Sequence, residues 1–236
     1  MYWPTNSPPP PDLPRQILQA HMLTSAYVNE FLVDQHPYRK GHVCPFVKSS
    51  LIIEGVVFSF VEATDGTELK NQVKQRIQEY LDFKSDFQET QSSMVILFPA
   101  SFSERTLVKL QLSLKAYCIK REIMIGALYP NSTAPSLHSE DYFPLRTPTP
   151  TLVLRDLVPM DILFLTQDRH HSVSKIGFLK EYIQKFSDHP SKIVRDKVQE
   201  ARQARRALRR FLIIRGGAVL LTIAITSVSL GAYFAL

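Results

Sequence analysis

The feature that most constrains the fold is an uncharged stretch at the C-terminal end, GGAVLLTIAITSVSLGAYFAL, which runs from Gly216 to Leu236. As an α-helix rising about 1.5 Å per residue, this stretch would be about 31 Å long, which matches the roughly 30 Å hydrocarbon core of a membrane. A buried core helix is the alternative, but a soluble helix of this length usually keeps a polar face. The sequence therefore predicts a transmembrane helix at 216–236.

The residues just before this stretch are strongly basic. Between Lys192 and Arg215 there are nine Lys or Arg residues and two acidic residues, Asp196 and Glu200. This segment thus carries a net charge of +7 in a chain whose total is +6, and the remainder is close to neutral. Basic residues beside a membrane span stay on the cytoplasmic side and attract anionic lipid headgroups. We expect a single-pass membrane protein whose bulk is cytoplasmic and in which 192–215 contacts anionic lipid.

The charge distribution also bears on other partners. A nucleic-acid-binding domain needs a basic face, and the near-neutral remainder of the chain does not supply one, so no nucleic-acid partner is expected. The N-terminus has no apolar run of the kind found in a signal peptide. In a cytosolic compartment Cys44 and Cys118 are expected to be reduced rather than paired.

Composition divides the chain into four regions. Residues 1–14 are rich in proline and are predicted to be a disordered lead. Residues 15–188 alternate helical periodicity with short apolar runs, which predicts a cytosolic α+β domain. Residues 191–215 form a basic juxtamembrane helix, and 216–236 form the tail anchor. The predicted fold class is thus α+β, with a mixed sheet flanked by helices and a C-terminal single transmembrane helix.

Within the domain, apolar spacing predicts the individual elements. A first helix follows Pro14, with an apolar stripe at three- and four-residue spacing. Its members are Ile17, Leu18, Met22, Leu23, Tyr27, Phe31 and Leu32. Strands are expected within 50–63, with Gly55 as a turn or bulge. The tract 131–150 is rich in Pro, Ser and Thr, and we expect it to be an ordered loop packed over another part of the domain.

The segment HPYRKGHVCPFV, residues 36–47, contains the first set of candidate functional residues. A thiolate followed by proline is one context in which cysteine binds haem iron, so Cys44 is a candidate iron ligand. His36, His42 and Cys44 are also three candidate zinc ligands close in sequence, with His138 as a distant fourth. Two other interpretations of Cys44 stay open: a reactive thiol, and a small residue packed beside the sheet.

A second set of candidate residues lies in and after the proline-rich loop. His138, Arg146 and Arg155 are the polar side chains that we expect to face a small-molecule ligand. The two arginines are suited to bidentate contacts with a carboxylate or phosphate. For Arg155 the alternative is a structural ion pair with Asp156 or Asp161. The usual phosphate-loop, nucleophile-elbow and paired-cysteine signatures are missing, so the sequence leaves open whether the protein is an enzyme.

Two passages together resemble a known family. HPYRKGHVCPFV and the run from IMIGALYP to RDLVPMDILFL are similar to an uncharacterised bacterial family, a domain of unknown function with HP…G…VCPF and MIG…LH…PLR.P.P motifs. More distantly, the order of elements resembles the haem-dependent N-hydroxylases of the guanitoxin type. The family resemblance marks the following motif positions: His36, Gly41, Cys44, Pro45, His138, Arg146, Pro148 and Arg155.

These observations lead to two functional hypotheses. The likeness to the N-hydroxylases implies haem as cofactor, with Cys44 as the iron ligand. His36 and His42, which are close to Cys44 in the sequence, are further candidate cofactor-binding residues. The chain would then be a membrane-tethered, haem- or iron-binding, oxygenase-like protein that acts on a small molecule. The alternative is a non-catalytic membrane-anchored scaffold or ligand-binding module.

Overall fold

The computed structural model describes residues 1–88, 90–136 and 138–233, with side chains described as far as residue 214. The chain divides into two compact units, Met1–Val158 and Pro159–Leu236.

The first unit is built on a five-stranded mixed sheet. Its strands are β1 (Tyr2–Pro4), β2 (Val56–Phe60), β3 (Ser93–Leu97), β4 (Ile123–Leu128) and β5 (Thr151–Asp156), in the order β1-β2-β3-β5-β4. Strands β2 and β3 are parallel, and β5 runs antiparallel to both β3 and β4. The carboxyl ends of β2, β3 and β4 therefore share one edge of the sheet, and β5 begins at that edge. The predicted α+β class with a mixed sheet agrees with this architecture.

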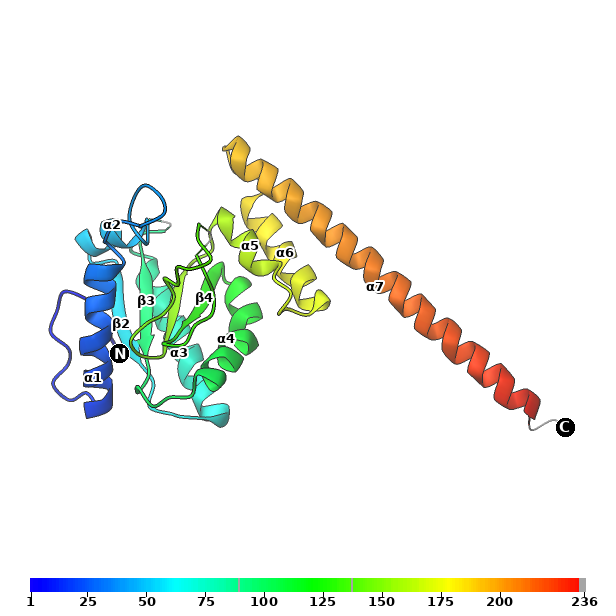
Figure 1. Ribbon diagram of the computed structural model, residues 1–236, viewed down its shortest axis with the longest axis horizontal. Coiled ribbons are helices and arrows are strands. Elements are labelled where there is room, and N and C mark those ends of the chain that lie inside the picture. Colours follow the sequence, from blue (N-terminus) through cyan, green and yellow to red (C-terminus); the bar gives the residue numbers. More distant parts are fainter. Residues whose placement is uncertain (89, 137, 234–236) are drawn as a thin grey trace. The chain divides into compact units, whose positions relative to one another are not determined.

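Helices cover both faces of the sheet. Helices α3 (Gly66–Lys84) and α4 (Glu104–Ile119) lie on one side, and α1 (Arg15–Ala26) lies on the other (Figure 1). Successive side chains of a strand point to opposite faces. Accordingly, Met94 and Ile96 of β3 pack with α3 and α4, while Val95 and Leu97 pack in the core under α1. Both faces are buried, which explains why the central strands are continuous apolar runs in the sequence.

One predicted strand is a helix instead. The apolar residues before Gly55 belong to α2 (Val47–Ile52), and the sheet begins only at β2. Gly55 connects the two elements at a very close approach, because a Cβ there would lie 2.1 Å from the backbone oxygen of Gln91. The backbone of Gly55 also accepts a hydrogen bond from the N–H of Ser93 at 2.8 Å. Glycine is therefore required at this position by contact rather than by a turn.

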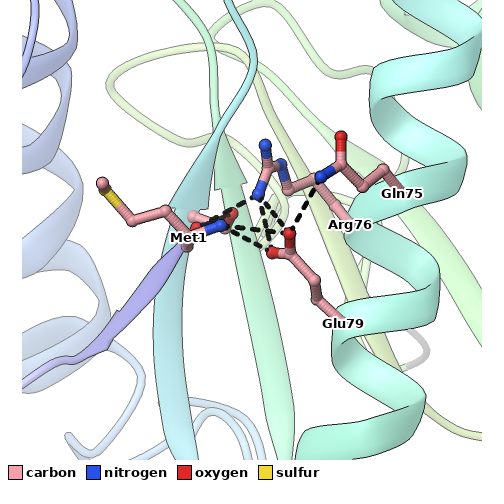
Figure 2. Close-up of polar contacts among 5 residues, drawn as sticks. Met1, Gln75, Arg76 and Glu79 are labelled. Carbon is pink, nitrogen blue, oxygen red and sulfur yellow. Dashed lines mark hydrogen bonds and ion pairs between the residues drawn. The ribbon is translucent and has the colours of Figure 1, made fainter.

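The N-terminal residues also differ from the expected disordered lead. Tyr2–Pro4 pairs antiparallel with β2, and Trp3 is only 5% exposed in the core under α1. The α-amino group of Met1 donates to the carboxylate of Glu79 at 2.9 Å, and Arg76 donates to the same carboxylate at 2.6 Å (Figure 2). Burying an indole ring contributes free energy that offsets the cost of ordering a short proline-rich segment.

The second unit is helical. It contains a 3-10 turn (η2, Pro159–Asp161) followed by α5 (Ile162–Leu165), α6 (Ser172–Phe186) and α7 (Lys192–Tyr233). α6 and the first turns of α7 pack together. The buried members are Phe178, Leu179, Tyr182 and Phe186 of α6, and Val194, Val198 and Ala201 of α7.

The predicted fold class is corrected at the C-terminus. Within the described part of the chain, no helix is both long enough and apolar enough to cross a membrane. Our prediction of a C-terminal transmembrane helix is therefore not supported by the described part of the chain. Charged side chains recur along the described part of α7 from Lys192 to Arg210, and they leave no long uncharged run there. The predicted anchor, 216–236, itself lies beyond the residues whose side chains the structure describes.

Candidate functional site

An open, mostly apolar groove of about 640 Å³ lies in the first unit, and it is a candidate binding site. One wall comes from α1 and from the π-helix that continues it, η1 (Tyr27–Phe31). The other comes from the loop that links β4 to β5. Its lining residues are Met22, Leu23, Ala26, Tyr27, Glu30, Phe31, Pro130, Arg146, Thr147 and Pro148.

The position of this groove follows from the sheet topology. Pro130 comes directly after the carboxyl end of β4, and Thr147 and Pro148 precede β5. In open α/β sheets, ligands commonly bind beyond the carboxyl ends of the strands. A volume of this size is also in the range of small-molecule pockets, about 300–1,000 Å³.

Two hydrogen bonds hold the loop against α1 and η1, and a third lies within the loop. The hydroxyl of Tyr27 donates to the backbone oxygen of Pro144 at 2.5 Å. The hydroxyls of Thr24 and Thr149 are 2.8 Å apart, and Thr147 donates to the backbone oxygen of Thr149 at 2.7 Å. Burial raises the pKa of Tyr27 well above its ordinary value, which keeps this hydroxyl protonated and able to donate. The loop is therefore an ordered wall of the groove, as the sequence predicts.

The π-helix determines which side chains face the groove. The N–H of Leu32 donates to the carbonyl of Tyr27 at 3.1 Å, which is the five-residue bond that defines a π-turn. Within that turn the rings of Tyr27 and Phe31 stack at 5.2 Å. Short π-helical turns cost stability and occur frequently at functional sites. Tyr27, Glu30 and Phe31 all come from this turn and line the groove.

The buried side of the first helix differs from the predicted stripe in a way that creates the groove. Ile17, Ala20 and Thr24 are buried, whereas Met22 is 68% exposed and Leu23 is 44% exposed. Large apolar side chains at such exposure are available to contact a ligand. They supply the apolar part of the groove wall.

Two opposite charges line the groove without neutralising each other. The Nε of Arg146 donates to the backbone oxygen of Ser132 at 2.9 Å, and its guanidinium lies 3.9 Å from the ring centre of Phe143. These two contacts fix the side chain and leave its terminal N–H groups without a partner among the described residues. Glu30 is exposed, and its carboxylate likewise makes no hydrogen bond or ion pair with any residue that the structure describes. Arg146 and Glu30 are thus both available to a ligand.

A separate cluster of histidine and tyrosine rings contains two of the predicted site residues, His36 and His138. His36 is 6% exposed, and its ring is 5.5 Å from the ring of His138 and 5.0 Å from that of Tyr142. Its Nδ1 accepts the backbone N–H of Tyr38 at 3.1 Å, so the proton of the neutral ring is on Nε2, which donates to the hydroxyl of Ser136 at 3.3 Å. Burial, and then the nearby charge of Arg39, lower the pKa of His36 and favour this neutral form.

This arrangement excludes a Ser–His nucleophile pair at Ser136. A histidine that activates a serine must accept its proton, yet Nε2 of His36 is the donor here. Nδ1 of His36 holds the backbone of its own loop, 36–44, and Nε2 ties that loop to the loop at 136–142. We therefore assign His36 a structural role.

The loop that contains Cys44 is a closed hairpin. The N–H of His36 donates to the carbonyl of Gly41 at 2.8 Å, and the N–H of Cys44 donates to the carbonyl of Leu32 at 2.9 Å. Gly41 has a φ of +93°, which glycine adopts at least cost. Arg39 closes the hairpin by donating to the backbone oxygens of His42 and Val43 at 2.7 and 3.1 Å. The backbone of this segment is thus fixed by its own hydrogen bonds.

The structure does not gather the predicted metal ligands into a site. Among the described residues, no group of three or more His, Cys, Asp or Glu side chains is placed to hold a metal ion. Cys44 is half-buried, and it is not among the residues that line the groove. Ligation of iron by Cys44 stays a prediction from the resemblance.

Arg146 and Arg155 do not converge on one ligand. Arg155 lies near the other end of β5, paired in register with Ser93 and Met124. At about 3.3 Å per residue, the four steps from Thr151 to Arg155 separate it by about 13 Å from the edge where the groove lies. Its Nη1 donates to the backbone oxygen of Asp156 at 2.8 Å. Of the three predicted ligand residues, the structure places Arg146 in the groove wall, with His138 and Arg155 elsewhere.

Comparison with known proteins gives a family and no described activity. A family model described as a domain of unknown function, DUF6875, matches residues 21–197. The predicted membership of an uncharacterised domain family is thereby confirmed. No curated protein and no solved structure matches the chain.

Proposed function

For this chain, which belongs to the DUF6875 domain family, we propose that the groove between α1–η1 and the β4–β5 loop binds a small carboxylate with an apolar body. The observation that carries the proposal is Arg146, held in place at an apolar surface with its terminal N–H groups unused. A guanidinium fixed in this way presents two parallel donors, which match the two oxygens of a carboxylate.

Preorganisation of Arg146 is what makes the proposal energetically reasonable. A free arginine loses rotamer entropy when it captures a ligand, whereas Arg146 is already held by Ser132 and by the ring of Phe143. Removing such ordering costs is a general source of affinity. Because the side chain is exposed, solvent screens the ion pair, and the charge contributes only about 1 kcal/mol.

The apolar surface contributes the rest of the binding free energy. Met22, Leu23 and Phe31 offer contact to an alkyl or aryl body, at about 25 cal/mol per Å² of apolar area removed from water. A ligand with about eight carbons that buries about 150 Å² would gain about 4 kcal/mol before association costs. The two contributions sum to about 5 kcal/mol, and association costs reduce this, so we expect a dissociation constant of about 1 mM or weaker for a simple probe such as octanoate.

The experiment is calorimetric titration of the full chain with octanoate and with the uncharged analogue 1-octanol. We expect octanoate to bind more tightly than octanol, and Arg146→Gln to weaken octanoate about five- to tenfold without changing octanol. Arg155→Gln is the matched control, because it removes the same charge outside the groove. Equal affinity for the acid and the alcohol, or the same octanoate affinity in Arg146→Gln and wild type, would refute the proposal.

A separate observation supports a second interaction, in which the described part of α7 binds anionic lipid headgroups. Positions 192–214 contain eight Lys or Arg against two acidic residues. Large apolar side chains are exposed beside the last arginines: Phe211 is 47% exposed, Ile213 73% and Ile214 71%. Arginines interleaved with exposed apolar residues are typical of helices that lie in a membrane interface. A nucleic-acid surface would use the charges and leave these apolar side chains in water.

Sedimentation with vesicles tests this second interaction. The full chain is expected to sediment with phosphatidylcholine vesicles containing phosphatidylserine, and less so as salt rises, since each basic residue near an anionic surface contributes about 1 kcal/mol. Replacing Arg205, Arg206, Arg209 and Arg210 by Gln should abolish the preference for phosphatidylserine. Equal binding of wild type and variant to these vesicles would contradict it.

A further inference from the structure

The second charge in the groove narrows the class of ligand. Glu30 lines the same groove as Arg146, and no ion pair joins the two among the described residues. A ligand that carries only a carboxylate would place its charge in a groove that also contains an unpaired carboxylate. Like charges in one site disfavour binding unless the ligand compensates both. The groove is therefore complementary to a molecule with two opposite charges.

Resting on the proposed function, we infer that the natural ligand is an amino carboxylate, whose carboxylate meets Arg146 and whose cationic group meets Glu30, with an apolar spacer between them.

The placement of the two residues supports a spacer. Arg146 belongs to the β4–β5 loop and Glu30 to η1, so the charges come from opposite walls of the groove. No hydrogen bond or ion pair joins their side chains among the described residues, and apolar residues line the groove with them. A ligand that satisfies both charges at once must therefore be long enough to reach from one wall to the other.

Aromatic rings on the η1 wall add to this selectivity. Tyr27 and Phe31 stack within the turn that contains Glu30, and both line the groove. The faces of aromatic rings attract cations and do not attract carboxylates. The η1 wall is thus suited to a cationic group through Glu30 and through its neighbours, and the Arg146 wall is suited to an anionic one.

The π-turn connects this chemistry to the fold. This turn brings Tyr27, Glu30 and Phe31 to the same groove. The hydrogen bond from the Tyr27 hydroxyl to the carbonyl of Pro144 holds the turn against the β4–β5 loop. The same bond anchors the loop that contains Arg146. The two charged walls are therefore held relative to each other by a direct contact within the unit Met1–Val158.

The test is a calorimetric comparison of matched probes on the full chain. The probes are 4-aminobutanoate, 6-aminohexanoate and 8-aminooctanoate, each compared with its parent carboxylate: butanoate, hexanoate and octanoate. The readout is the ratio of the two dissociation constants within each pair. This ratio cancels the carboxylate contact and isolates the contribution of the ammonium group.

We expect the amino carboxylate to bind more tightly than its parent carboxylate, and most clearly at one chain length. At that length Glu30→Gln should reduce this preference about threefold, as for the loss of a partly exposed ion pair. Octanoate itself should bind Glu30→Gln as well as or better than wild type, since a repulsion is removed. Glu30→Asp keeps the charge on a shorter side chain and should preserve the ratio at the same or the next longer probe. Glu68→Gln, on the opposite face of the sheet, is the matched control and should change nothing.

The outcomes distinguish a failure of the amino-carboxylate inference from a failure of the proposed function. If Glu30→Gln leaves the ratio unchanged at every length while octanoate binding still depends on Arg146, the amino-carboxylate inference is overturned and the proposed function stands. If no probe binds in a manner that depends on Arg146, both are overturned.

Discussion

The bond between Tyr27 and Pro144 is a test of how the groove is built, because it joins two segments 117 residues apart. Tyr27→Phe removes only the hydroxyl that donates to the carbonyl of Pro144. The ring of Tyr27 remains to stack on Phe31 and to fill the core, where the side chain is 7% exposed. The substitution thus isolates the hydrogen bond from the packing.

The expected cost follows from burial. A net hydrogen bond contributes about 0.5–1.5 kcal/mol, and leaving a buried carbonyl without a donor adds to the loss. Because Tyr27 is buried, water does not readily replace its hydroxyl, so we expect a total of about 1–2 kcal/mol. For a protein of this size, 1 kcal/mol lowers the melting temperature by roughly 2–4 °C. Tyr27→Phe should therefore melt about 3–6 °C below wild type.

Thermal unfolding followed by circular dichroism measures this, with octanoate titration as the second readout. Tyr38→Phe is the control, since Tyr38 is 54% exposed and its hydroxyl makes no hydrogen bond to any described residue. We expect Tyr27→Phe to weaken octanoate binding as well, because the loop that contains Arg146 loses an anchor. A melting temperature within about 1 °C of wild type, with unchanged octanoate affinity, would refute the view that this bond holds the groove together.

Three further substitutions test other parts of the account. Gly55→Ala should cost more than about 3 kcal/mol in denaturant unfolding, because its Cβ would lie 2.1 Å from the Gln91 oxygen; a cost below 1 kcal/mol would contradict that contact. Burial lowers the pKa of His21 below its ordinary value of 6.5, so the unfolded chain takes up the proton first and stability falls as pH drops below about 6.5. His21→Phe should remove part of this slope in melts between pH 5 and 7.5, His36 supplying the remainder, and an unchanged slope would contradict the assignment. Cys44→Ser should leave octanoate affinity unchanged, since Cys44 lies outside the groove wall; a loss comparable to that of Arg146→Gln would relocate the site.

The sheet was largely predictable because its strands are buried on both faces. The runs at β3, β4 and β5 are short and apolar throughout, which is the pattern of a central strand. The apolar residues before Gly55 also suggest a strand, yet they form α2. A run of three apolar residues does not distinguish a strand from a helical turn, and only the close contact between Gly55 and Gln91 decides where the sheet begins.

The site was predictable only in part. Arg146 stands out in the sequence as a charged residue in a proline-rich loop, and it does line the groove. Arg155 looked equivalent because it is close in sequence, but the intervening strand carries it to the other end of the sheet. Glu30 gave no signal, since the spacing of Tyr27, Phe31 and Leu32 fits an α-helix as well as a π-turn. Which side of that helix is buried depends on the distant loop that packs against it.

The most direct test of the central claim is an NMR titration of the full chain with octanoate that follows backbone amides and the Nε–H of Arg146. The account predicts saturable shifts at Ala26–Phe31, at 146–148 and at the Arg146 Nε–H, with none at Arg155 or around Cys44. Shifts concentrated at 36–44 or at Arg155, with the Arg146 signal unmoved at saturation, would contradict it.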